Sequence, residues 1–140
     1  SLRLLLAISA NKGYAVDSLD ISTAFLNGDI DREVYVKSAF RFQRPSASYN
    51  KVWKLNKALY GLKQSPKLWY MGLHEHLLSL GFQRSGYESC LYSRRDSLGG
   101  ELMVAVYIDG LVVSGSSSAM VSDFKRSLAS KYDLTDLGEL

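Results

Sequence analysis

The sequence predicts an α+β domain built on a mostly antiparallel sheet of the split βαβ kind, with helices packed on one face. Its 140 residues are about the length of one domain, so a second complete core is close to excluded. Hydrophobic residues make up 46% and charged residues 22%, with only two prolines, which indicates a chain that buries a core. The periodicities predict, in order, helix, strand, short strands, long helix, hairpin and helix.

The first two elements are a helix and a strand. Residues 2–12 follow the helical period, and Gly13 supplies the left-handed residue that often ends a helix. The predicted helix face consists of Leu2, Leu5, Leu6 and Ser9. Residues 15–21 alternate as a strand that carries Asp20 near its C-terminal edge. Asp17, three residues earlier, is expected on the opposite face of that strand.

The middle of the chain predicts two short strands and the long helix. After the turn signal Asn27-Gly28, residues 33–37 and 52–55 are strand candidates, separated by a serine-rich loop. Ser65-Pro66 is a favourable helix start, and Gly81 marks the helix end. The apolar face of this helix contains Trp69 and Tyr70, expected in the core; His74 and His76 are expected on the surface.

The last third predicts a hairpin and a helix. Residues 90–94, 102–108 and 111–114 are strand candidates, and Asp109-Gly110 is a strong signal for a type I′ hairpin turn. Cys90 is expected to be a small buried hydrophobe. Serines 116–118 can cap a final helix, whose apolar face consists of Val121, Phe124, Leu128 and Tyr132. In such a sheet the end of the first strand and the hairpin tip lie side by side, which predicts that Asp20 and Asp109 are neighbours able to hold divalent cations.

The positive charges are concentrated in one part of the chain. No acidic residue occurs between Val34 and His74, and this stretch carries eight basic residues: Lys37, Arg41, Arg44, Lys51, Lys54, Lys57, Lys63 and Lys67. The rest of the chain has nine basic and 14 acidic residues. This block favours a polyanion such as nucleic acid as partner, and on charge alone a solvated lysine-rich surface explains it equally well.

Several protein classes are excluded by composition. The longest apolar stretches fall short of the roughly 20 residues of a membrane span, so no membrane partner is expected. The single cysteine excludes an internal disulfide and a multi-thiolate zinc site. No signal peptide is expected, and the opening Ser-Leu-Arg indicates numbering that starts inside a longer protein.

Four short motifs occur in a characteristic order and spacing. They are LDISTAFLNG at 19–28, LYGLKQSPKLWY at 59–70, YIDG at 107–110 and DLGEL at 136–140, with LSLGF at 78–82 between them. Together they resemble copia-type LTR-retrotransposon reverse transcriptases over essentially the whole chain. The resemblance implies that residues 1–140 are one partial reverse transcriptase domain, the palm with part of the fingers, without the early fingers, the thumb and RNase H.

The resemblance implies RNA-directed DNA polymerase chemistry that uses two Mg²⁺ ions for nucleotidyl transfer. Asp20 and Asp109 are then the catalytic residues and metal ligands, with the Ile21 carbonyl as a further ligand. The family has Asp-Asp at the hairpin tip, where this chain has Asp109-Gly110, so the third carboxylate is missing. Because of Gly110 and the missing parts, the 140 residues alone are expected to be inactive.

The resemblance also implies nucleotide- and nucleic-acid-binding residues. Phe25 resembles the aromatic gate that selects deoxynucleotides, and Gly61, Lys63 and Gln64 resemble the loop beside the template and nascent base pair. Without the resemblance, Phe25 would be a core residue and the loop an ordinary helix start. The predicted nucleic-acid-binding residues are Lys51, Lys54, Lys57 and Lys67.

The implied partners are an RNA or DNA template-primer, deoxynucleoside triphosphates and the remainder of the Pol polyprotein. The implied location is intracellular, either in a cytoplasmic virus-like particle or in the nucleus. The alternative is a degenerate, catalytically inactive retroelement remnant that only binds nucleic acid, which Gly110 favours. An unrelated α+β binding module is a third hypothesis, and the four ordered motifs disfavour it.

Overall fold

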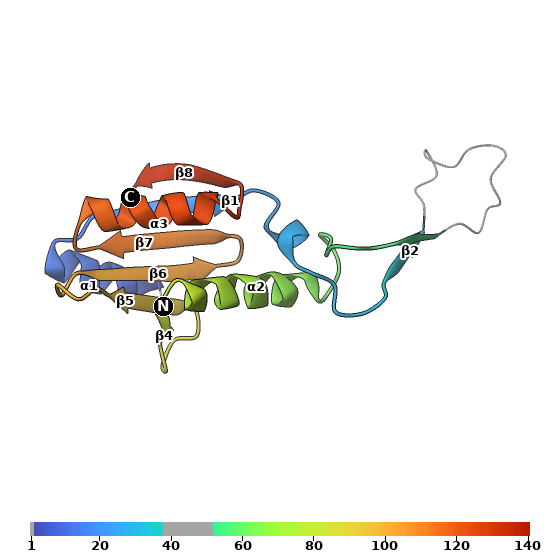
Figure 1. Ribbon diagram of the computed structural model, residues 1–140, viewed down its shortest axis with the longest axis horizontal. Helices are drawn as coiled ribbons and strands as arrows, with labels where there is room; N and C mark the ends of the chain where they lie inside the picture. Colours follow the sequence, from blue (N-terminus) through green and yellow to red (C-terminus); the bar gives the residue numbers. More distant parts are fainter. Residues whose placement is uncertain (1, 38–51) are drawn as a thin grey trace. The chain divides into compact units, whose positions relative to one another are not determined.

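The computed structural model describes residues 2–37 and 52–140 (Figure 1). The chain divides into two compact units, one made of Ser1–Ala24 with Leu73–Leu140 and the other of Phe25–Gly72. The prediction of a single partial domain over residues 1–140 stays a prediction. Three of the eight basic-block residues, Arg41, Arg44 and Lys51, lie outside the described residues.

The larger unit is built on a six-stranded sheet with the order β4-β5-β6-β7-β1-β8. Every neighbouring pair of strands in it is antiparallel. The strands are β1 (Val16–Ile21), β4 (Gln83–Arg84), β5 (Leu91–Arg95), β6 (Glu101–Tyr107), β7 (Gly110–Gly115) and β8 (Leu134–Glu139). This sheet, together with three helices, confirms the predicted α+β class.

Two crossover connections interlock in this sheet. Because adjacent strands are antiparallel, β1 and β6 run in the same direction with β7 between them. By the same reasoning β7 and β8 run in the same direction with β1 between them. Each arrangement is a split βαβ unit, as the sequence predicts. The interlock places the C-terminal end of β1 beside the β6–β7 hairpin.

The two central strands are buried on both faces. Every residue of β6 before Tyr107 is buried, and so is every residue of β7 after Gly110. Strands covered on both sides are expected to be continuously apolar, which explains the run LMVAV and the following LVV.

The helices α1 (Leu2–Lys12) and α3 (Ser118–Ala129) cover opposite faces of the sheet (Figure 1). Leu5 of α1 packs in a cluster with Met103, Ala105 and Val112. Side chains of consecutive strand residues alternate between faces, so Leu102 lies on the other face, where Val121 of α3 packs beside Gly115. The expectation that all helices share one face therefore does not hold for α1.

Local signals explain both of these helices. Gly13 follows α1 with φ +65°, as predicted. Leu5 and Ser9 are buried, whereas Leu6, expected on the same face, is exposed because the contact stripe is narrow. In α3 the Ser117 hydroxyl caps the helix by accepting from the Met120 amide at 3.3 Å, as the serine cluster predicts.

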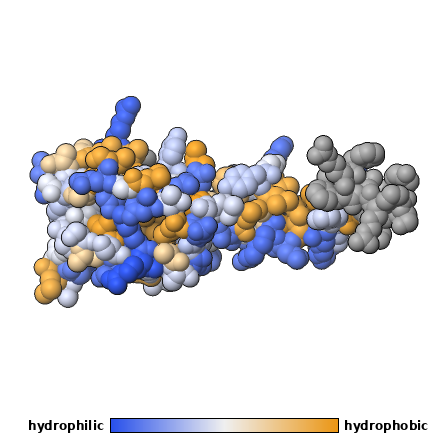
Figure 2. Space-filling model, turned by 90° about the horizontal axis from the view of Figure 1, so that it is seen from above, coloured by the Kyte–Doolittle hydropathy of each residue, from blue (hydrophilic) through white to orange (hydrophobic). Residues whose placement is uncertain are grey.

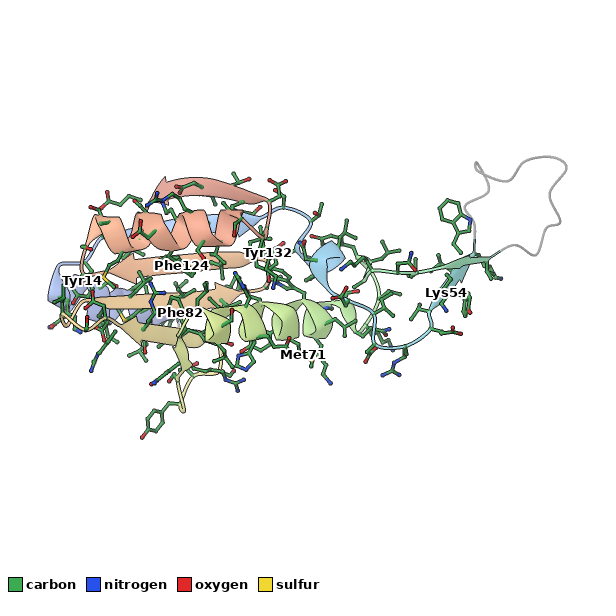
Figure 3. All side chains as sticks on the ribbon, in the orientation of Figure 1. Tyr14, Lys54, Met71, Phe82, Phe124 and Tyr132 are labelled. Atoms are coloured by element: carbon green, nitrogen blue, oxygen red, sulfur yellow. The ribbon has the colours of Figure 1, made fainter. Side chains whose placement is uncertain are left out.

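The predicted apolar face of α3 is buried as Val121, Phe124 and Leu128, and Tyr132 after the helix is buried as well. The Phe124 ring lies 5.2 Å from the Phe82 ring, centroid to centroid (Figure 3). On the surface drawn in Figure 2, hydrophilic and hydrophobic residues are interspersed. None of the helices in the described ranges is long and apolar enough to cross a membrane.

The long helix α2 (Ser65–Ser79) begins and ends where the sequence predicts, and Gly81 follows it with φ +83°. Its first eight residues belong to the smaller unit and the rest to the larger one. Trp69 is buried as expected, as are Leu73 and Leu77. The Ser65 hydroxyl donates to the Leu59 carbonyl at 2.5 Å, so this serine ties the preceding loop to the helix start.

Two histidines of α2 and one cysteine differ from expectation. His74 is half-buried, with Nδ1 2.9 Å from the Tyr92 hydroxyl. His76 is half-buried too, with its ring edge-on to Tyr132 at 5.6 Å and a buried Nε2 atom that has no hydrogen-bond partner within residues 2–37 and 52–140. The prediction that both histidines lie on the surface is wrong, because the buried face of α2 is broader than the apolar pattern indicates. Cys90 is half-buried rather than fully buried.

The smaller unit carries the turn η1 (Ala24–Asn27), whose first residue belongs to the larger unit, and a two-stranded sheet. Its strands β2 (Tyr35–Lys37) and β3 (Val52–Lys54) pair antiparallel, which confirms both predicted strands. An isolated antiparallel bridge joins Asp29 to Lys57.

Candidate functional site

The end of β1 lies beside the tip of the β6–β7 hairpin in the larger unit. The β1–β7 register pairs Asp20 with Gly110. The Ile21 amide donates to the Asp109 carbonyl at 3.1 Å. These contacts confirm that Asp20 and the hairpin tip are neighbours, because the interlocked crossovers insert β1 next to β7. The roles of Asp20, Ile21 and Asp109 stay predictions.

Both carboxylates at this edge lack a compensating charge among the described residues. Asp20 and Asp109 are half-buried, and neither side chain makes an ion pair or hydrogen bond within residues 2–37 and 52–140. The strand register and the Ile21–Asp109 backbone hydrogen bond bring both residues to the same end of β1, where their carboxylate oxygens are the donors that a divalent cation prefers. The edge is therefore suited to bind positive charge.

Asp17 provides the contrast, since its carboxylate is neutralised. Lys125 of α3 lies 2.6 Å from Asp17 Oδ2 and 2.7 Å from Asp136 Oδ2. Burial by itself lowers the pKa of Lys125, but the hydrogen bonds to Asp136 and Asp17 outweigh it and raise the pKa. Lys125 thus joins α3 to β1 and β8. The prediction that Asp17 faces away from Asp20 agrees with this contact.

The hairpin turn lies one residue earlier than predicted. Tyr107 pairs with Gly110, so the two-residue loop is Ile108-Asp109 rather than Asp109-Gly110. Ile108 has φ +55°, whereas Asp109 and Gly110 have no positive φ, so the turn is not type I′.

Long-range packing explains this register. Gly115 pairs with Leu102, and a Cβ atom built on Gly115 would lie 2.8 Å from Leu102 Cδ1 and 3.1 Å from Val121 Cγ2. A side chain at this position would displace Leu102 or Val121, so glycine is favoured opposite Leu102 beneath α3. The local preference of Asp-Gly for a tight turn is weaker than this packing and does not set the register.

Two β-branched residues beside the carboxylates have a left-handed backbone. Thr23, two residues after Ile21, has φ +51°, and Ile108, next to Asp109, has φ +55°. Across the described residues they are the only non-glycine residues with positive φ. Such conformations cost about 1 to 3 kcal/mol each and cluster at functional sites. Sequence patterns did not reveal this strain.

The smaller unit brings the predicted nucleotide-binding segments together. The Phe25 ring lies 4.6 Å from the Tyr60 ring, centroid to centroid, with the planes tilted by 39°. The Ala58 amide donates to the Gly28 carbonyl at 3.0 Å, and the Gly28 amide donates to the Phe25 carbonyl at 3.1 Å. Residues 25–29 thus run alongside residues 57–60, at the start of the predicted loop.

That loop opens α2 as predicted. Gly61 has φ +94°, a conformation that favours glycine, and the Leu62 amide donates to the Leu59 carbonyl at 3.3 Å. Lys63 is exposed and Gln64 is half-buried at its end. A Cβ atom on Gly28 would lie 3.1 Å from the Trp69 amide nitrogen, so the turn after Phe25 packs directly on the backbone of α2.

Comparison with known proteins decides the family. The reverse transcriptase (RNA-dependent DNA polymerase) family profile matches residues 1–140. The chain belongs to the reverse transcriptase family. Its relatives are transposon Pol polyproteins, which confirms the copia-type resemblance. No solved structure matches the chain significantly.

Three relatives of this reverse transcriptase chain illustrate the likeness. It is 33% identical over 138 residues to the Retrovirus-related Pol polyprotein from transposon TNT 1-94 of Nicotiana tabacum. The matched region covers 99% of this chain and 10% of that protein. It is 32% identical over 145 residues to the Retrovirus-related Pol polyprotein from transposon RE1 of Arabidopsis thaliana, a match that covers 100% of this chain and 9% of that protein. A putative transposon Ty5-1 protein of Saccharomyces cerevisiae is 37% identical over 122 residues, a match that covers 87% of this chain and 39% of that protein. The chain thus spans about a tenth of the first two relatives.

The reverse transcriptase family implies a divalent metal, and the donor set at the β1–β7 edge fits one. Within the part of the chain that the structure describes, no three His, Cys, Asp or Glu residues lie close enough together to hold a metal. Asp20, Asp109 and the Ile21 carbonyl offer only oxygen donors. Mg²⁺ takes such donors and usually completes its shell with water and substrate phosphates, so one or two carboxylates suffice.

Two of the lysines in the basic block make ion pairs that the sequence did not indicate. Lys54 makes an ion pair with Glu33, and Lys57 makes one with Asp29. The hydrogen bond from Lys54, followed by that from Tyr35, lowers the pKa of Glu33. Strand pairing and the isolated bridge bring these carboxylates in from outside the block, which local sequence could not reveal.

The charge asymmetry nevertheless persists. Residues 25–72 carry nine basic and three acidic residues, against eight and 11 in the larger unit. Lys63 and Lys67 are exposed and have no carboxylate partner among the described residues. Lys51 lies outside those residues.

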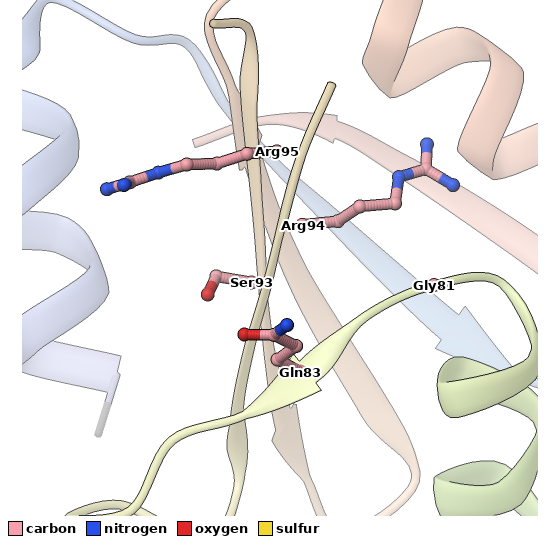
Figure 4. A pocket seen from close by; sticks show the side chains of 5 residues that line it. All are labelled: Gly81, Gln83, Ser93, Arg94 and Arg95. Carbon is pink, nitrogen blue, oxygen red and sulfur yellow. The ribbon is translucent and has the colours of Figure 1, made fainter. Parts of the chain in front are cut away.

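A polar pocket beside β4 and β5, at one lateral edge of the sheet, is not part of the site. Its lining residues are Gly81, Gln83, Ser93, Arg94 and Arg95 (Figure 4). Arg94 donates to the Leu80 carbonyl at 2.9 Å and lies over the Phe82 ring, and Arg95 pairs with Glu101 at 3.1 Å. Its cationic groups therefore already have protein partners.

Proposed function

We propose that this chain is the palm, with part of the fingers, of an RNA-directed DNA polymerase, and that Asp20 and Asp109 are its metal-binding carboxylates. The observation that carries the proposal is the β1–β7 register, which pairs Asp20 with Gly110 and joins the Ile21 amide to the Asp109 carbonyl. The unpaired state of both carboxylates among the described residues and the two left-handed residues beside them support it.

The reaction joins a deoxynucleotide to a primer. The primer 3′ oxygen forms a bond to the α-phosphorus of the triphosphate, the bond to pyrophosphate breaks, and the hydroxyl proton leaves. Mg²⁺, when bound, supplies Lewis acidity that activates the hydroxyl and neutralises the triphosphate and the departing pyrophosphate. Asp20 and Asp109 would hold the cations, and the β1–β7 strand pairing fixes the backbone that carries Asp20.

The smaller unit supplies the nucleotide and nucleic-acid contacts in this proposal. Phe25 meets the incoming sugar and excludes a ribose 2′-hydroxyl. Gly61, Lys63 and Gln64 line the template and nascent base pair. Lys67 binds phosphates directly, whereas Lys54 and Lys57 would have to exchange Glu33 and Asp29 for phosphates. Lys51, which lies outside the described residues, is the fourth predicted phosphate contact.

A second candidate function is that of a degenerate copy that only binds nucleic acid, and Gly110 favours it. Glycine offers no carboxylate, so the site has one negative charge fewer than the Asp-Asp pattern. The backbone does not demand glycine, because Gly110 has no positive φ and a Cβ atom there would meet only the Leu19 and Tyr107 carbonyls at 3.5 and 3.6 Å. The fold therefore accepts a carboxylate at this position.

Mn²⁺ used as a paramagnetic probe on the ¹⁵N-labelled chain tests the carboxylate site. We expect broadening of the Asp20, Ile21 and Asp109 amide signals, loss of that broadening in Asp20→Asn, and no change in Asp123→Asn, an exposed carboxylate on α3. Broadening centred elsewhere, or retained in Asp20→Asn, would overturn the assignment.

Primer extension separates the two candidate functions. The 140 residues alone are expected to give no extension. When the segment replaces its counterpart in an intact relative's polyprotein, Gly110→Asp should raise extension by orders of magnitude, because the added charge acts at the metal site. Equal extension with and without Gly110→Asp would show that another group completes the site.

A further inference from the structure

Tyr60 is an exposed aromatic residue that packs on the proposed sugar gate. Its ring centroid lies 4.6 Å from that of Phe25, at a tilt of 39°, within the range of favourable aromatic pairs. Tyr60 is 53% exposed, so it is not a core residue. A large ring left half in solvent and stacked on another ring needs a reason other than burial.

The backbone on both sides of this pair is held tightly. The Gly28 amide donates to the Phe25 carbonyl, and the Gly28 carbonyl accepts from the Ala58 amide, two residues before Tyr60. Directly before Tyr60, the Leu59 carbonyl accepts from the Ser65 hydroxyl at 2.5 Å and from the Leu62 amide at 3.3 Å, so residues after Tyr60 hold this carbonyl. With both main chains anchored, the remaining freedom lies in the side chains, where each ring limits the rotamers of the other.

The contact uses the ring of Tyr60 and not its hydroxyl. Among the described residues no hydrogen-bond partner exists for the Tyr60 hydroxyl. A gate that rejects a ribose by contact with one oxygen atom must hold its ring to within a fraction of an ångström, since a ring that swings away opens space for the 2′-hydroxyl. Tyr60 is placed to prevent that movement.

We infer that Tyr60 is a positioning residue that holds the Phe25 ring and thereby sharpens discrimination between deoxy- and ribonucleotides. The inference rests on the proposed role of Phe25 as the sugar gate. Phe25 contacts the sugar, and Tyr60 acts through it. The hydroxyl of Tyr60 is dispensable, so a phenylalanine at this position should still hold the Phe25 ring, whereas an aliphatic residue should not.

Nucleotide binding to the full 140-residue chain, with phenylalanine rings ¹³C-labelled, tests the inference. Titrations with dGTP and GTP in Mg²⁺ give the ratio of the two dissociation constants, and the Phe25 ring signals, assigned with Phe25→Leu, report ring position. The variants are Tyr60→Leu, Tyr60→Phe and, as matched control, Tyr35→Leu, which removes a tyrosine that is 51% exposed on β2. Circular dichroism confirms that each variant is folded.

We expect the wild-type chain to prefer dGTP, and Tyr60→Leu to reduce that preference roughly two- to tenfold, the worth of one aromatic pair. Tyr60→Phe and Tyr35→Leu should keep the wild-type ratio, and only Tyr60→Leu should move the Phe25 ring signals. An unchanged ratio in Tyr60→Leu, with Phe25→Leu reducing it, would overturn the role of Tyr60 and leave the gate intact. A wild-type chain with no preference, or Phe25→Leu with a wild-type ratio, would overturn the gate and the inference together.

Discussion

Introducing a carboxylate at Gly110 tests whether charges meet at the β1–β7 edge. Gly110 pairs directly with Asp20, so the side chain of Gly110→Asp would point to the same face. Paired residues on antiparallel strands lie about 5 Å apart, where two like charges repel by about 1 kcal/mol in water and about 3 kcal/mol at a surface dielectric of ~20. Removing a glycine from a strand returns roughly 0.5 to 1 kcal/mol.

Gly110→Asp should therefore lower the free energy of unfolding by about 0 to 2.5 kcal/mol relative to wild type in metal-free, low-salt buffer. Gly110→Asn, which has the same shape without the charge, should match or exceed wild type, since a Cβ atom at this position meets only ordinary contacts. Adding Mg²⁺ should reverse the order of stability, so that Gly110→Asp becomes more stable than Gly110→Asn. At a concentration of about 100 times its dissociation constant, a ligand that binds only the folded state adds about 2.7 kcal/mol.

Urea unfolding with and without Mg²⁺ measures these differences. The response to Mg²⁺ should be larger in Gly110→Asp than in wild type and smallest in Gly110→Asn, and salt should shrink the metal-free difference between the two variants. Equal stability of Gly110→Asp and Gly110→Asn at low salt, together with equal responses to Mg²⁺, would refute the reasoning that this edge gathers carboxylates.

Three further predictions concern other parts of the chain. Burial, followed by repulsion from Lys131, lowers the pKa of His76, so the folded state favours the neutral imidazole. The contribution of His76 to stability is therefore present above the unfolded-state pKa and is lost as the pH falls through the folded-state pKa. Urea unfolding at about pH 7.5 and about pH 5 should show a smaller loss of stability for His76→Gln than for wild type, and an equal loss would contradict this. Gly28→Ala should destabilise the chain by about 1 to 3 kcal/mol, since the new Cβ atom would lie 3.1 Å from the Trp69 amide nitrogen. Gly72→Ala, whose Cβ atom would meet nothing within 4 Å, should stabilise the chain. Similar changes in the free energy of unfolding for both variants would refute the close approach at Gly28. The chain should bind a labelled primer-template weakly, with an affinity that falls steeply as the salt concentration rises. Lys67→Ala should reduce the slope of log affinity against log salt concentration by about 1. An affinity that does not depend on salt would contradict phosphate contacts.

Helices with strong local signals were predictable from the sequence alone. The serine cluster before α3 and its apolar face at Val121, Phe124 and Leu128 lie where the pattern places them. The same holds for α2, which begins at Ser65 and ends before Gly81. Capping and 3.6-residue periodicity act over a few residues, so the sequence contains this information in readable form.

Strands without an alternating pattern were not predictable in this way. The edge strand β8 is mostly exposed, contains Gly138 at φ +83° and was not anticipated, nor was the two-residue β4. An edge strand with one lightly buried face has no reason to alternate apolar and polar residues. Such strands form because β1 and β5 offer free hydrogen-bonding groups to pair with.

At the candidate site, the sequence by itself determined which residues are available: the motifs predict Asp20, Ile21, Asp109, Phe25 and the loop at Gly61, and the resemblance implies that Gly110 stands in place of a second aspartate. Tertiary structure decided how these residues meet. The turn lies at Ile108-Asp109 in a register that places Gly115 opposite Leu102 beneath α3, Lys54 makes an ion pair with Glu33, and the Tyr60 ring packs on Phe25. These outcomes depend on contacts between segments far apart in the chain, and a local pattern of residues holds no information about which distant segment it will touch.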